Sequence, residues 1–239
     1  MTVTEPELGA FIATFVRAAA LAATVPVIGD AHVPVRARLV FVIAIAFGVG
    51  ANRPGVPYDE LPLVVVVELA MGLMTGLCAR FVMARVAVAG QLVGLSLGLG
   101  FAAQYDPNAG ESAGVLRMIF TTLAGLAFLS VGGFEALIRS TSSSPSHVTD
   151  LALLGPELLR QGTIAFSHGL ALAGPIVLAA LIANIGLAIM NRAAPAINVF
   201  SLSLATLMML GGLVLLATAT DLIGSITNVA HDAMAILTP

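Results

Sequence analysis

The chain has 239 residues, of which 59% are hydrophobic and only 10% are charged, with a formal net charge of -3. A soluble domain carries about 25% charged residues, so the composition excludes an ordinary soluble protein and predicts an integral membrane protein or one buried in a larger apolar assembly. The small net charge does not suggest nucleic acid as a partner, and the single cysteine, Cys78, excludes an internal disulfide.

Four apolar segments follow one another in the first part of the chain and predict membrane-type helices. They occupy residues 8–28, 39–51, 63–84 and 86–104. The second is too short for a straight spanning helix, which needs about 20 residues. Trp is absent and only two Tyr occur, so the aromatic belt of a simple lipid-bathed bundle is missing. These features predict that not every segment is an ordinary spanning helix.

Residues 115–138 form a fifth apolar segment, and the serine-rich stretch 139–150 is predicted to be a loop. A short amphipathic helix is expected over 151–163, because its leucines are apolar while Glu157 and Arg160 are polar. The basic and acidic residues of the links do not alternate cleanly, so the positive-inside rule leaves the membrane topology open.

Two long apolar segments, 164–190 and 196–220, come next. The residues around 191–195 include an Asn and a Pro that interrupt a helix, which predicts a helical hairpin. Pro175 is expected to kink the first arm. The tail, 221–239, is expected to continue the last helix into water.

Glycines recur at four-residue spacing in the third and fourth segments. On a helix, such glycines stack on one face and leave a shallow groove that another helix backbone can approach closely. We therefore expect helix packing at five positions: Gly72, Gly76, Gly90, Gly94 and Gly98.

A polar loop follows the second set of glycines. Asp106 precedes a proline, which pushes it out of the α region and ends the helix, and Asn108 and Gly110 tolerate turn geometry. Asp106 and Glu111 are costly to bury and would prefer water to lipid. The residues alone predict a short flexible turn on a rigid base.

Two charged side chains, Arg17 and Glu68, lie inside apolar segments. A lone intramembrane carboxylate suggests a functional site, but a structural contact with a neighbouring subunit or with an Arg such as Arg17 is favoured over proton coupling. No nucleophile–base pair, phosphate loop or metal-spaced cluster emerges. The sequence therefore predicts no catalytic residue, no cofactor and no metal site.

Four stretches, in the right order, resemble the FliR family of flagellar export-gate proteins. Residues 89–107, AGQLVGLSLGLGFAAQYDP, are similar to the family's central signature, and residues 68–77, ELAMGLMTGL, to the glycine-spaced segment before it. Residues 184–200, NIGLAIMNRAAPAINVF, are similar to its C-terminal hairpin turn, and residues 16–39 resemble its N-terminal stretch. The resemblance covers nearly the whole chain.

The resemblance implies an all-α, membrane-associated fold in which residues 1–160 are FliP-like and residues 161–239 form a FliQ-like helical hairpin. It implies a non-enzymatic core subunit of the type III export gate, part of a closed channel for unfolded protein substrates. The loop near 105–114 would be the channel plug, with the residues Tyr105, Asp106, Pro107, Asn108, Ala109, Gly110, Glu111 and Ser112. The hairpin turn would contain Asn191, Arg192, Pro195 and Asn198.

The resemblance also implies the partners: FliP and FliQ in a helical hetero-oligomer, FlhB on its outside, and the exported proteins, in the bacterial inner membrane at the flagellar basal body. The equivalent subunit of a virulence-type III secretion system remains an alternative. A small-solute transporter, suggested by broken helices with polar groups at the midplane, should show two half-repeats, and none is convincing. An intramembrane enzyme should show paired catalytic residues, which are absent from the sequence.

Overall fold

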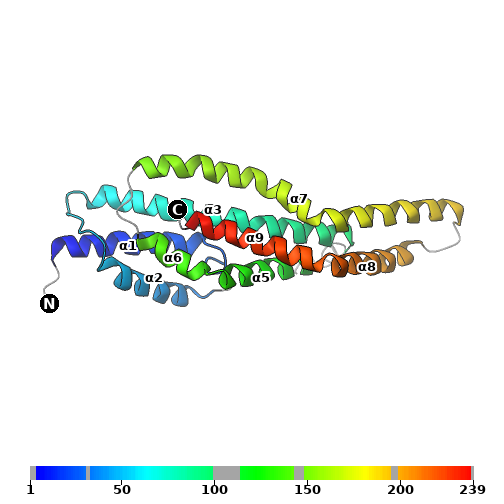
Figure 1. Cartoon of the computed structure of the whole chain (residues 1–239), viewed down its shortest axis with the longest axis horizontal. Helices are drawn as coiled ribbons and strands as arrows, with labels where there is room; N and C mark the ends of the chain where they lie inside the picture. Colours follow the sequence, from blue (N-terminus) through cyan, green and yellow to red (C-terminus); the bar gives the residue numbers. More distant parts are fainter. Residues whose placement is uncertain (1–3, 31–32, 99–113, 143–147, 195–198, 238–239) are drawn as a thin grey trace. The chain divides into compact units, whose positions relative to one another are not determined.

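The computed structural model describes residues 4–30, 33–98, 114–142, 148–194 and 199–237, and every regular element in these ranges is an α-helix (Figure 1). This confirms the all-α fold that the apolar segments predict and that the family resemblance implies. The helices are α1 (Glu5–Thr24), α2 (Val35–Gly50), α3 (Leu61–Ser96), α5 (Val115–Ser130), α6 (Gly133–Ser142), α7 (Val148–Ala193), α8 (Val199–Ala217) and α9 (Ala219–Leu237).

The ends of α1 follow from its local sequence. The backbone N–H of Thr4 donates to the carboxylate of Glu7 at 2.8 Å, which satisfies a donor at the helix start. Two acidic residues in the first turn also suit the positive end of the helix dipole. The helix ends at Thr24, and Val25, the residue before Pro26, is extended as a pre-proline residue should be.

Two helices are longer than the sequence predicted. The segments 63–84 and 86–104 share one helix, α3, which ends at Ser96, and the predicted amphipathic helix 151–163 continues into the first hairpin arm as α7. The expected break in α3 fell at Arg85, but a charged side chain interrupts the apolar pattern without disturbing the backbone hydrogen bonds. Only proline or an unfavourable backbone conformation does that.

Two predicted segments are instead broken. The segment 115–138 forms α5 and α6, which meet at 62°. Gly132 in this break has a φ of 92°, a conformation that glycine adopts without strain. The end of the segment 196–220 and the predicted tail form α8 and α9, bent by 65° around Thr218. The tail therefore forms a separate helix, whose axis departs from that of the last apolar arm.

The chain packs into two compact units. Unit 1 comprises Met1–Met83, Gly125–Ile164 and Ala230–Pro239, and unit 2 comprises Ala84–Ala124 and Ala165–Val229. In unit 1, α1, α2 and α6 pack against one another, with α1 and α2 antiparallel, since the rings of Phe11 and Phe47 lie 4.9 Å apart near the start of one helix and the end of the other. The largest fully buried apolar side chains of unit 2 are those of Phe120, Ile176, Val86 and Val93.

Several helices have the length and composition of membrane spans. Among the described residues these are Glu5–Thr24, Leu61–Ser96 and Gly155–Ala193, with two further spans if each bent helix pair counts as one. Many large apolar side chains remain exposed on α2, α3, α5, α7 and α8. A water-exposed monomer rarely carries so much apolar surface, which agrees with the membrane class predicted from composition.

Candidate functional site

The most unusual feature inside unit 1 is a buried group of three charged side chains and one hydroxyl, which we call the ionic cluster: Arg17, Arg53, Glu68 and Thr14. Glu68 is fully buried, and its Oε1 lies 2.6 Å from Nη2 of Arg53 while its Oε2 lies 3.4 Å from Nη1 of Arg17. Arg53 also donates from Nη1 to the hydroxyl of Thr14 at 3.2 Å. The four residues come from α1, α3 and the link between α2 and α3.

Local structure brings each member to the cluster. Thr14 and Arg17 are three residues apart on α1 and so lie on the same face, and the Thr14 hydroxyl donates to the carbonyl of Ala10 at 2.7 Å. Arg53 lies just beyond α2, where its N–H donates to the carbonyl of Gly50 at 3.3 Å. The same link is tied to α1, because the N–H of Val56 donates to the carbonyl of Pro6 at 3.0 Å.

The charges of the cluster make its members interdependent. A carboxylate removed from water is tolerated only when paired and hydrogen-bonded, and Glu68 accepts from two guanidinium groups. Arg53 contributes a planar fork that joins the carboxylate to Thr14, although its buried Nε has no hydrogen-bond partner. The cluster therefore ties the α2–α3 link and α3 to α1 by directional contacts, which apolar packing alone does not supply.

Two predicted glycines continue the face of α3 that carries Glu68. A Cβ on Gly72 would lie 2.7 Å from both the carbonyl oxygen of Arg17 and the Cβ of Ala20, and a Cβ on Gly76 would overlap the side chain of Thr24. Glu68, Gly72 and Gly76 follow one another at four-residue spacing, so α3 approaches α1 backbone to backbone along this line. The ionic cluster lies at one end of this close contact.

The second glycine set behaves differently. In unit 2, a Cβ on Gly90 would lie 2.8 Å from the Cβ of Phe120 and 2.9 Å from the Cα of Arg117, so α5 crosses α3 closely there. A Cβ on Gly94 would meet only Leu116, at an ordinary 3.9 Å. Gly98 lies beyond the end of α3 with a φ of 76°. The prediction that Gly98 shares this helix face is therefore wrong, because the helix has already ended.

The structure describes only some of the remaining predicted site residues. The plug, from Tyr105 to Ser112, lies outside the described residues, as do Pro195 and Asn198 of the hairpin turn. Asn191 and Arg192 lie exposed in the last turn of α7. Within the described ranges, no three His, Cys, Asp or Glu side chains are grouped as metal ligands would be.

Sequence reasoning missed Arg53. It lies in a link rich in proline and glycine, where a charged residue is normally solvated, and nothing in the local pattern distinguishes it from a surface Arg. The available signal was indirect: a carboxylate inside an apolar segment needs cationic partners, and the sequence suggested Arg17 only as one example of such a partner. Gly169 was missed as well, although a Cβ there would lie 2.8 Å from the carbonyl of Arg85.

Comparisons with known proteins identify the family of the chain. Residues 8–233 match the family model of bacterial export proteins, family 1. The flagellar biosynthetic protein FliR of Escherichia coli strain K12 is 30% identical over 198 residues, which are 77% of this chain and 74% of the relative. FliR of Aquifex aeolicus strain VF5 is 30% identical over 219 residues, 87% of this chain and 84% of the relative. FliR of Bacillus subtilis strain 168 is 27% identical over 207 residues, 82% and 80% of the two chains. The chain belongs to family 1 of the bacterial export proteins, the family of the FliR proteins.

Proposed function

We propose that this chain is a non-enzymatic core subunit of the flagellar type III protein-export gate. The observation that carries the proposal is the family match over residues 8–233, together with relatives named flagellar biosynthetic protein FliR that align over most of both chains. The subunit forms part of a closed channel through which unfolded substrates pass. It resides in the bacterial inner membrane at the flagellar basal body.

The exposed surface supports a subunit that is covered by other molecules. Six helical glycines would meet nothing within 4 Å if they carried a Cβ: Gly48, Gly155, Gly174, Gly186, Gly212 and Gly224. Glycine destabilises a helix by about 1 kcal/mol relative to alanine, so glycine at an open helix surface suits a position where another chain approaches closely. Large exposed aliphatic side chains accompany these glycines on α7 and α8.

The proposed partners are FliP and FliQ within a helical hetero-oligomer, and FlhB on its outside. In this arrangement residues 1–160 correspond to a FliP subunit and residues 161–239 to a FliQ hairpin. The loop Tyr105–Ser112 is the plug that closes the channel at rest, and its acidic residues suit a water-filled path rather than lipid. Shortening it by removing residues 108–112 is expected to leave assembly intact and make the membrane leaky to ions.

The ionic cluster has a structural role in this function. The cluster ties α1, the α2–α3 link and α3 together. It therefore fixes the position of α3 against α1, next to the close contact at Gly72 and Gly76. A subunit that has to pack precisely against several partners benefits from such preorganisation. No proton relay is required, since both carboxylate oxygens of Glu68 are engaged by guanidinium groups.

The test is complementation of a motile bacterium that lacks FliR. The expected result is recovery of swimming and of flagellin export, and co-purification of the tagged chain with FliP and FliQ, whereas an empty vector gives neither. In parallel, a strain lacking the corresponding subunit of a virulence-type system tests the alternative. Recovery of virulence-type secretion without motility, or a monodisperse monomer that binds neither partner, would contradict the proposal.

A further inference from the structure

The turn that follows α1, residues 25–30, contains a backbone conformation that is rare for its residue type, and we call it the strained turn. Ile28 donates its N–H to the carbonyl oxygen of Pro26 at 3.0 Å, and Val27 between them has a φ of 73°. A hydrogen bond across one residue of positive φ defines the strained form of the γ-turn. Among the residues that the structure describes, Val27 is the only non-glycine residue with a positive φ, and its branched Cβ makes this region especially unfavourable.

The residues on either side of Val27 are anchored in unit 1. Val25 is fully buried, and Pro26 and Ile28 are buried as well. The N–H of Gly29 donates to the carbonyl oxygen of Val25 at 2.9 Å. Backbone strain persists only where the surrounding structure determines the conformation, and these contacts hold both flanks of Val27.

The half-buried side chain of Val27 lies against α5. A Cβ on Gly125 of α5 would lie 3.1 Å from Cγ2 of Val27, which is closer than an ordinary van der Waals contact. The missing Cβ of this glycine therefore leaves the space that the Val27 side chain occupies in the strained turn.

Arg80 of α3 closes the strained turn from outside by contacting both of its ends. Its Nη1 donates to the carbonyl oxygen of Thr24 at 3.4 Å, and its Nη2 donates to Oδ1 of Asp30 at 3.1 Å. The side chains of Arg80 and Asp30 are 44% and 37% exposed. The pair that closes the turn is therefore accessible to salt and to charged groups of other molecules.

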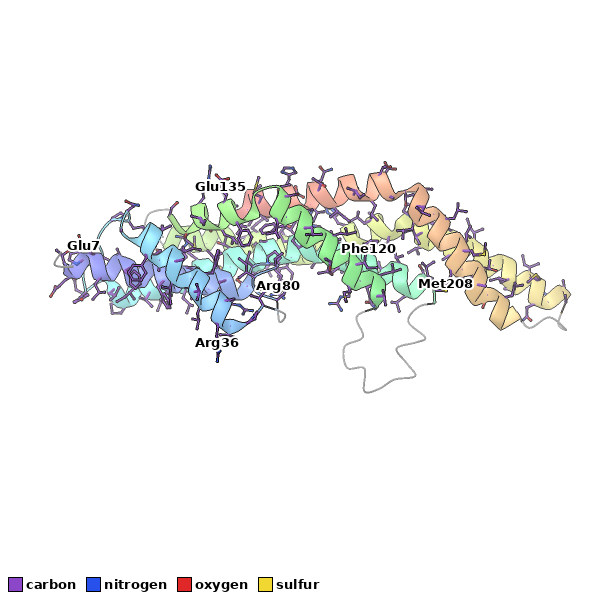
Figure 2. All side chains as sticks on the ribbon, turned by 90° about the horizontal axis from the view of Figure 1, so that it is seen from below. Glu7, Arg36, Arg80, Phe120, Glu135 and Met208 are labelled. Carbon is purple, nitrogen blue, oxygen red and sulfur yellow. The ribbon has the colours of Figure 1, made fainter. Side chains whose placement is uncertain are left out.

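The two ends of α2 are held by different kinds of contact. Beyond its end, the buried ionic cluster ties the α2–α3 link to α1. Its start follows the strained turn, where Arg38 donates to the carbonyl oxygen of Asp30 at 3.1 Å. Figure 2 shows Arg80 closer to Arg36, in the first turn of α2, than to Glu7 at the start of α1. The end of α2 is thus fixed by buried contacts, and its start depends on the strained turn.

We propose that the strained turn is a two-state latch, which Arg80 holds closed and which opens to a relaxed conformation of Val27 when the pairing of Arg80 with Asp30 is lost. Opening releases the start of α2, while its end stays tied to α1. Strain of this kind disfavours the closed turn by about 5–150-fold, so contacts as modest as an exposed ion pair shift the balance between the two states. The inference goes beyond the proposed export function and does not depend on it.

The test measures amide hydrogen exchange of Ile28 and Gly29, whose N–H groups are bonded within the closed turn. The tagged full chain is purified from membranes together with the subunits that bind it. Val27→Gly removes the strain and should slow exchange several-fold. The greater freedom of glycine in the open state would by itself speed exchange, so slower exchange can come only from the removed strain.

The closing contact is tested with Arg80→Gln, which should speed exchange by up to about five-fold. Asp30→Asn removes the same pair from the other side and should act in the same direction, as should 1 M sodium chloride on the unaltered chain, because salt screens an exposed pair. Arg139→Gln, which breaks an exposed pair elsewhere in unit 1, is the matched control and should change nothing at the turn. Val27→Gly in the Arg80→Gln chain should return exchange to the rate of the unaltered chain or below it.

Faster or unchanged exchange in Val27→Gly would overturn the latch, because the turn would then store no strain. Unchanged exchange in both Arg80→Gln and Asp30→Asn, or an equal effect of Arg139→Gln, would overturn the closing role of the ion pair. None of these measurements uses motility or export, so a failed latch leaves the proposed function standing.

Discussion

The helix α3 passes through both units and carries a line of residues at four-residue spacing in each, with different outcomes. In unit 1 each of the three residues Glu68, Gly72 and Gly76 has a close neighbour. Glu68 pairs with two arginines, and the two glycines lie against the backbone and side chains of α1. In unit 2 only Gly90 meets a backbone closely, Gly94 has ordinary space, and Gly98 is outside the helix. Spacing indicates which residues share a helix face, but whether another helix meets that face depends on the tertiary packing.

The largest effect on stability is expected for a substitution of Glu68. Glu68→Gln removes the one carboxylate between two buried guanidinium groups and should lower stability by roughly 3–5 kcal/mol, because an uncompensated buried charge remains. The measurement is a denaturant titration of the gate co-purified with the variant, accompanied by the cellular level of the chain. Glu135→Gln, which breaks an exposed pair, is the matched control and should have little effect.

A smaller loss of stability is expected for a substitution of Arg53, which sequence reasoning did not place in the site. Arg53→Lys keeps the positive charge but replaces the fork that reaches both Glu68 and Thr14, so about 1.5–3 kcal/mol should be lost with one charge-assisted hydrogen bond. The same titration measures it. Thr14→Val should remove part of this difference, and equal effects of Arg53→Lys in both backgrounds would show that the Thr14 contact contributes nothing.

The next largest effect is expected for a substitution of Gly90, where α5 crosses α3 closely in unit 2. Gly90→Ala forces a methyl group against the α5 backbone, and overpacking of this kind costs about 1–3 kcal/mol, less the gain of about 1 kcal/mol in helix propensity. Reduced co-purification with the proposed partners and slower swimming are expected. If Gly90→Ala assembles and swims like the unaltered chain, the close approach of α5 is not needed for assembly.

The smallest effect on stability is expected for a substitution of Gly94, one helical turn after Gly90 on α3. Gly94→Ala places a methyl group at an ordinary contact distance, so it should leave stability unchanged or raise it by up to about 1 kcal/mol through helix propensity. The comparison of the Gly90 and Gly94 variants in one titration sharpens the contrast within unit 2. A loss at Gly94 equal to that at Gly90 would mean that the helix face as a whole is filled in the assembled gate.

Much of the fold could be predicted because apolar content is a strong signal. Composition and segment length were sufficient for an all-helical membrane protein, and the spacing of Gly72 and Gly76 indicated close packing before its partner was known. Helix boundaries were harder. The helix α3 continues through Arg80 and Arg85, because a charged side chain does not break a helix, whereas Gly132, just beyond the end of α5, adopts a positive φ.

The candidate site could be predicted only in part. Glu68 stood out because a carboxylate in an apolar segment needs a partner, and Arg17 was a natural choice. Arg53 could not be chosen from several arginines, because its burial depends on the hydrogen bond that ties the α2–α3 link to α1. Gly169 gave no periodic signal, since it packs on α3 as a single residue.

The sequence by itself determined the class of the protein, its family signatures and the faces of its helices, because these depend on composition and on residues close together in the chain. The tertiary structure alone decided which faces are occupied, which arginine completes the ionic cluster, and where the charges collect. Along the sequence, Glu5 and Glu60 are far apart and loop charges show no clear alternation. Once the α2–α3 link is tied to the start of α1, Glu5 and Glu60 lie at the same end of unit 1, because charge acts through space and only the fold sets those distances.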